Sequence, residues 1–224
     1  MEKIYLDICS GVPRYVYTGC NHCSSSMGRS LCEFEHRGCC FYYPKFELLN
    51  IQRMAKSLKG LQILELIRQK PKTTINRFSI HTQGFFNKES YETYKNTEDF
   101  YSDEAPQDKS LLFKTCPFVK DGVGCTIPHN FRDNVCNFFI CKEALSDDKV
   151  KEAYTPYLEA MQNYIRWVEW ENITLQHLLI EEKLNLIDDF KNTIKFLQEI
   201  PLDVYEFSNL TPIYISSGNW SKGA

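Results

Sequence analysis

Residues 116–141 read CPFVKDGVGCTIPHNFRDNVCNFFIC, and this cysteine-rich stretch decides the expected fold. Its four cysteines are Cys116, Cys125, Cys136 and Cys141. Gly122 and Gly124 predict a tight turn between the first two of them, because glycine accepts the backbone angles that such turns need. The turn would bring the sulfur atoms of Cys116 and Cys125 close to each other, as in a metal-binding knuckle. The stretch therefore predicts a region that is organised around cysteine side chains.

A second group of cysteines lies near the start of the chain, in residues 20–40. Its members are Cys20, Cys23, Cys32, Cys39 and Cys40. The two-residue gap in Cys20-Asn21-His22-Cys23 lets both sulfurs turn toward one ion. Gly38 allows a backbone bend before the adjacent pair of cysteines. Cys9 stands apart from both groups, and we leave it out of the expected site.

The bulk composition is that of an ordinary globular protein. The chain has 224 residues, 43% of them hydrophobic, and a formal net charge of −3. No basic excess indicates a nucleic-acid partner. No apolar stretch is long enough for a membrane span, and the first residues do not resemble a secretory signal. We therefore expect a cytoplasmic protein with no membrane or nucleic-acid partner, and we cannot name a protein partner.

Ten cysteines in such a chain indicate metal binding or redox chemistry, because the cytosol keeps thiols reduced. Scattered buried thiols would be the alternative, but these cysteines are clustered. Crowded thiols raise one another's pKa, and a bound cation reverses this. Thiolates select zinc or an iron–sulfur cluster. The expected ligands are Cys20, Cys23, Cys39, Cys40, Cys116, Cys125, Cys136 and Cys141, with Cys32 and His22 as further candidates.

These residues carry a resemblance to a known family. The motif residues are Cys20, Cys23, Gly38-Cys39-Cys40, Cys116-Pro117-Phe118, Gly124-Cys125-Thr126-Ile127, Arg132, Cys136 and Cys141. Over about residues 15 to 142 the chain resembles the YkgJ-like cysteine-cluster family, which is named for a zinc- or iron-chelating CxxCxxCC domain. Two features depart from that pattern. Asp133 stands where the family usually has proline, and Cys32 lies in a longer spacing between Cys23 and Cys39.

The resemblance implies a metal site, with zinc and an iron–sulfur cluster both proposed for the family. Aromatic residues flank the cysteines and would shield a cluster, which favours iron–sulfur slightly over zinc. They are Phe41, Tyr42, Tyr43, Phe118, Phe138 and Phe139. One branch of the family, the flagellin lysine-N-methylase type, makes a methyltransferase that uses S-adenosylmethionine an alternative. A redox or electron-transfer protein is another, and whether the chain is an enzyme stays open.

The remaining sequence predicts a mainly α fold with irregular cysteine-rich loops and few short strands. We expect a metal-binding domain over residues 1–142 and a C-terminal helical pair within 143–224 that packs on it. The spacing of apolar residues predicts one helix from Phe46 to Leu58 and another before Pro71. Within residues 71–110 we expect short strands or a third helix, and then an exposed loop from Asn96 to Ser110.

The C-terminal pair is expected to begin at a Ser146 cap. Apolar residues from Val150 to Val168 mark its first helix, and those from Leu175 to Leu197 mark its second. Pro201 should end the second helix. Arg132 is expected to pair with a carboxylate or thiolate near the site.

Overall fold

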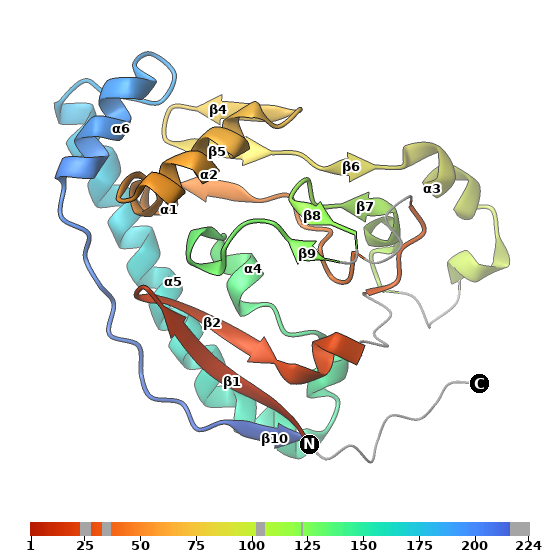
Figure 1. Cartoon of the computed structure of the whole chain (residues 1–224). Helices are drawn as coiled ribbons and strands as arrows, with labels where there is room; N and C mark the ends of the chain where they lie inside the picture. The colour runs from red at the N-terminus through yellow and green to blue at the C-terminus, as the bar shows by residue number, and fades with distance from the viewer. Residues whose placement is uncertain (23–27, 33–36, 102–105, 122, 216–224) are drawn as a thin grey trace.

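One long helix forms the spine of the protein (Figure 1). The computed structural model describes residues 1–22, 28–32, 37–101, 106–121 and 123–215. Helix α5 (Asp148–Glu181) has 34 residues and is therefore about 50 Å long. Small sheets and shorter helices lie against it, so the mainly helical fold with few short strands is confirmed.

Residues 2–17 and residues 213–215 form a three-stranded antiparallel sheet. Its strands, in spatial order, are β10 (Ile213–Ile215), β1 (Glu2–Cys9) and β2 (Val12–Tyr17). Ser10 and Gly11 turn the chain between β1 and β2 with φ angles of 51° and 72°. Two positive φ angles in a two-residue turn match the twist of a β-hairpin. No pattern in the sequence predicted these strands.

A second small sheet supports the first pair of helices. Its strands are β3 (Lys45–Glu47), β5 (Ser79–Thr82) and β4 (Thr73–Asn76), and the helices are α1 (Leu48–Ala55) and α2 (Leu58–Gln69). The predicted helix from Phe46 to Leu58 is therefore wrong at both ends. Phe46 belongs to β3, and Leu58 begins α2 because the Ser57 hydroxyl accepts a 3.0 Å hydrogen bond from the backbone N–H of Gly60. The second helix does end before Pro71, as predicted.

The middle of the chain consists of short elements, and residues 71–110 contain both short strands and a third helix. The regular elements are β6 (Phe85–Phe86), α3 (Lys88–Tyr94), β7 (Lys114–Thr115), β8 (Val119–Lys120), β9 (Gly124–Cys125) and α4 (Asn134–Phe138). The 3₁₀ turns are η1 (Thr18–His22), η3 (Glu98–Tyr101), η4 (Lys109–Phe113), η5 (His129–Phe131) and η6 (Lys142–Leu145). The predicted exposed loop thus contains η3 and the start of η4, and residues 102–105 lie outside the described part.

The C-terminal helices divide at a different place from the one predicted. Asp147, rather than Ser146, caps α5, accepting hydrogen bonds from the N–H groups of Lys149 and Val150. The helix then continues through Leu175, because no glycine or proline interrupts residues 169–174. The second helix is the shorter α6 (Phe190–Glu199), which ends before Pro201 as predicted.

A single cluster of buried side chains runs through both halves of the chain. It includes Ile4 of β1, Leu49 of α1, Phe138 of α4 and Tyr164 of α5. The division into domains at residue 142 stays a prediction, while helix α5 does pack on the cysteine-rich part. None of the helices in the described ranges is both long and apolar enough to cross a membrane.

The contact between α1 and α2 gives a first testable prediction. A Cβ atom on Gly60 would lie 2.1 Å from the backbone oxygen of Met54, far inside contact distance. Gly60→Ala is therefore expected to lower the free energy of unfolding by about 3 kcal/mol, measured by urea denaturation. Lys59→Ala, an exposed neighbour on the same helix, is the control and should change it by less than about 0.5 kcal/mol. Equal stability of the two variants would contradict the close approach of these helices.

Candidate metal centre

The two cysteine groups lie beside each other in the fold. The backbone N–H of Cys116 donates a 2.7 Å hydrogen bond to the backbone oxygen of Cys40. A second bond, 2.8 Å from the N–H of Leu31 to the oxygen of Leu112, joins the same two segments. Backbone bonds of this length fix the positions of both chains. Segments far apart in sequence therefore present their cysteines to one region.

The predicted turn between Cys116 and Cys125 is present. Strands β8 and β9 pair antiparallel, with Val119 opposite Cys125. The hairpin is fastened at its base, where the N–H of Thr126 donates to the oxygen of Phe118 at 2.8 Å. Gly124 has a φ of 90°, and so occupies a conformation that other residues adopt only with strain. This part of the site was accessible to sequence reasoning because the turn is local.

Four thiols from three segments form an electrostatic group, here called the thiol quartet: Cys40, Cys116, Cys125 and Cys136. Burial, together with the charges of Cys40 and Cys125, raises the pKa of Cys116 to about 12. The pKa of Cys40 is raised by burial and by Cys125. None of the four forms a disulfide with another cysteine of the described part. Because charges on these thiols raise one another's pKa, the four thiols lie close enough to interact electrostatically.

Helix α4 brings the last member of the thiol quartet into place. Cys136 is an exposed residue of this helix. Desolvation of its thiol raises the pKa of Cys136, and the charges of Asp133 and of the three other thiols raise it as well. The carboxylate of Asp133 caps the helix by accepting from the N–H of Val135 at 2.8 Å. The side chain of Asn137 donates to the oxygen of His129 at 2.9 Å. Asp133, where the resembling family has proline, thus starts the helix that carries Cys136.

Two of the other predicted ligands, Cys20 and Cys141, lie near Tyr17. Both raise the pKa of Tyr17, after its burial and its bond to Glu2. Cys23 falls outside the described residues, as does the side chain of His22. The full set of eight cysteine ligands therefore stays a prediction.

Cys32 and Cys39 lie around Arg37, together with Cys40 of the thiol quartet. The buried sulfur of Cys32 lies 2.9 Å from the hydroxyl of Thr115 and 3.1 Å from that of Ser30, and either atom of each pair can be the donor. Thr115 directly precedes Cys116, so Cys32, a further candidate ligand in the sequence analysis, lies beside the thiol quartet.

Arg37 is the residue that sequence reasoning missed. Its side chain is only 2% exposed, and it donates to the backbone oxygens of Arg29 and Leu111 at 2.8 Å and to that of Gly38. Its Nε atom has no acceptor. Among the residues with described placement, no carboxylate pairs with it, and the thiols of Cys32, Cys39 and Cys40 oppose the lowering of its pKa by burial. The signal in the sequence was its place next to Gly38-Cys39-Cys40.

A buried guanidinium group needs a negative neighbour, because desolvating an unpaired charge is costly. Among the described residues, the groups whose negative charge acts on Arg37 are the sulfurs of Cys32, Cys39 and Cys40. Arg132 adds a second positive charge, which lowers the pKa of Cys40, while its Nε donates to the oxygen of Ile127 at 2.7 Å. This agrees with the expected role of Arg132 beside a thiolate.

The donor chemistry fits a thiolate-bound metal. The thiol quartet supplies four sulfur atoms whose ionisation is opposed by burial and by their own repulsion, so a bound cation would stabilise them as thiolates. Over the described ranges, no group of three or more His, Cys, Asp or Glu side chains is arranged so that it could hold a metal ion as it stands.

Replacing Arg37 tests its role as a buried counter-charge. Arg37→Met is expected to lower the free energy of unfolding by about 3 kcal/mol, because it leaves carbonyl oxygens and sulfurs without their cation. Arg37→Lys should recover part of that loss. Arg29→Met, which changes an exposed arginine nearby, is the control. Chemical denaturation measures all three, and a fully stable Arg37→Met variant would exclude the role.

Comparison of the chain with protein-family models, with curated proteins and with solved structures finds no match in any of the three. The resemblance to the YkgJ-like family therefore depends on the motif residues alone.

Proposed function

We propose that this chain is a metal–thiolate protein in which the thiol quartet holds a zinc ion or an iron–sulfur cluster. One observation carries the proposal. Three segments that are distant in sequence, around Cys40, around the Cys116–Cys125 hairpin and around Cys136, bring their thiols within electrostatic reach of one another.

Such a group is unfavourable without a cation. Each thiol in it has to remain protonated, since ionising one raises the pKa of the next. A metal ion or cluster replaces the protons, and its positive charge attracts all of the thiolates and so offsets their mutual repulsion. Arg37 and Arg132 then offset the excess negative charge that thiolate ligands bring to the site.

The surroundings of the thiol quartet favour an iron–sulfur cluster slightly over zinc. The Phe41 and Phe139 rings meet edge to face at 6.2 Å, and the pKa of Tyr42 is raised to about 12 by burial, by Asp133 and by Cys136. Aromatic neighbours of this kind shield a cluster from water. When bound, a cluster would supply one-electron transfer, whereas zinc with four thiolates would stabilise the fold.

The lysine-methylase and electron-transfer alternatives remain secondary. Each would require the cluster form of the site, so the identity of the metal decides whether either is worth testing. We suggest purifying the protein without air and measuring iron, acid-labile sulfide and zinc beside a visible absorption spectrum. Iron with sulfide supports the cluster, zinc without colour supports the structural site, and neither metal overturns the proposal.

Single substitutions then test the ligand assignment. Alanine in place of Cys40, Cys116, Cys125 or Cys136 is expected to reduce metal retained per chain at least about tenfold, because thiolate ligands provide most of the binding free energy. Cys9→Ala is the matched control, since Cys9 lies at the end of β1 beside Ser10.

Elemental analysis gives the readout, and circular dichroism separates loss of metal from loss of fold. Normal metal content in all four variants would assign the metal to other cysteines. The pair Cys20 and Cys141 would be tested next, because both lie near Tyr17.

A further inference from the structure

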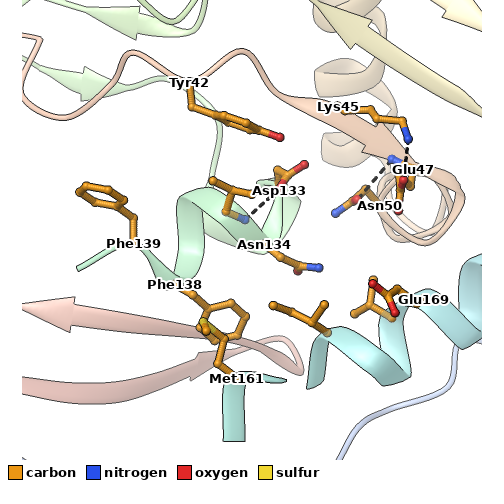
Figure 2. Close-up of a pocket in the computed structure, with 13 residues that line it drawn as sticks. Tyr42, Lys45, Glu47, Asn50, Asp133, Asn134, Phe138, Phe139, Met161 and Glu169 are labelled. Atoms are coloured by element: carbon orange, nitrogen blue, oxygen red, sulfur yellow. Dashed lines mark hydrogen bonds and ion pairs between the residues drawn. The ribbon is translucent and has the colours of Figure 1, made fainter. Parts of the chain in front are cut away.

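A pocket of about 420 Å³ opens beside α4, between that helix and α5 (Figure 2). This volume lies within the range of small-molecule sites, about 300–1,000 Å³. Its lining residues are Tyr42, Lys45, Glu47, Asn50, Asp133, Asn134, Val135, Phe138, Phe139, Met161, Ile165, Val168 and Glu169. Helix α4 thus contributes to this pocket and, through Cys136, to the thiol quartet.

The walls of the pocket are mostly apolar and include three aromatic rings. Phe138 and Val168 are each 5% exposed and belong to the protein core, so one wall is firmly packed. Phe139 is 38% exposed and lies at the opposite side from Glu47 in Figure 2. Tyr42 supplies the third ring. A hydrated inorganic ion gains nothing from such walls, whereas an organic ligand buries apolar surface on them.

One pair of charges in the pocket is already balanced. The Lys45 ammonium lies 2.8 Å from the carboxylate of Glu47. Glu47 also accepts a 2.8 Å hydrogen bond from the side chain of Asn172, and its backbone N–H donates to the side-chain oxygen of Asn50 at 3.4 Å. These bonds hold Glu47 at the start of α1, where it is the ion-pair partner of Lys45.

The two other carboxylates leave the pocket negative. Glu169 has no hydrogen-bond or ion-pair partner anywhere in the described part of the chain, and its carboxyl group faces the pocket in Figure 2. Asp133 accepts from the backbone N–H of Val135, and the charge of Lys45 acts to lower its pKa, so the ammonium of Lys45 is shared among the three carboxylates of the pocket. Burial raises the pKa of Asp133 to about 6, so this carboxyl remains mostly ionised at neutral pH.

We propose that this pocket binds a small organic cation: an ammonium group on an apolar body, with the charge between Asp133 and Glu169 and the body on the aromatic and aliphatic walls. Charge complementarity fixes the sign of the ligand, and the apolar lining fixes its organic character. The ring of Tyr42 lies beside Asp133 in Figure 2 and can add cation–π attraction, a common way for proteins to hold alkylammonium groups. This site does not depend on a metal at the thiol quartet.

Calorimetric titration of the full chain tests the proposal with matched probes. n-Hexylammonium and benzyltrimethylammonium should bind, whereas hexan-1-ol and hexanoate, which have a similar body and no positive charge, should bind at least about tenfold more weakly. A blocked lysine peptide and free n-hexylammonium separate a side chain of another protein from a free amine. Magnesium and calcium chloride test the carboxylates alone.

Three variants locate the binding. Asp133→Asn keeps a good helix cap while removing the charge, and Glu169→Gln changes an exposed residue, so both should fold. Each is expected to weaken hexylammonium binding about threefold to fivefold. Glu181→Gln removes an exposed carboxylate of α5 outside the pocket and should leave the affinity unchanged.

Three outcomes would overturn the inference. They are equal binding of the cation and the alcohol, binding of divalent metal in place of the organic cation, and undiminished affinity in both pocket variants. Because the titrations are repeated on protein stripped of metal, failure here is distinguishable from failure of the thiol quartet to hold one.

Discussion

The aromatic contacts of Tyr164 hold the structure together. Its ring is fully buried in α5 and lies 5.5 Å from that of Phe138 on α4 and 5.8 Å from that of Phe207 on the C-terminal segment. Its hydroxyl accepts a 2.9 Å hydrogen bond from Arg53 of α1. One side chain thus joins four parts of the chain, and aromatic pairs of this kind add to the free energy of burial. Because α4 is anchored through Phe138, the position of the Cys136 thiol depends on these contacts.

Charge, rather than packing, is the main constraint on the cysteine region. It encloses several thiols and the buried guanidinium of Arg37 in a small volume. The positive charge of Arg37 favours ionised sulfurs beside it, whereas burial and mutual repulsion oppose their ionisation. A bound cation shared by the sulfurs would remove that opposition, which is why we propose a metal here.

The parts that could be predicted from sequence are those fixed by neighbours along the chain. The turn between Cys116 and Cys125 follows from local glycines, and the helical character of the C-terminal part follows from apolar spacing. Helix limits were harder, because the stripe around Leu175 continues the preceding helix without a break. The sheet formed by β1, β2 and β10 joins opposite ends of the sequence, which no local pattern reveals.

The candidate site shows the same division between local and distant information. Motif spacing singled out the cysteines. The structure groups four of them in the thiol quartet, with Cys32 and Cys39 beside Cys40 around Arg37 and with Cys20 and Cys141 near Tyr17. Arg37 was missed because an arginine in a sequence is ordinarily expected at the surface. The pairing of β10 with β1 also bears on the order of synthesis. Glu2 leaves the ribosome long before its partner Ile215, and closing so long a loop is slow. Until residues 213–215 have emerged, β1 lacks one of its two neighbouring strands, so the nascent chain presents an open strand edge.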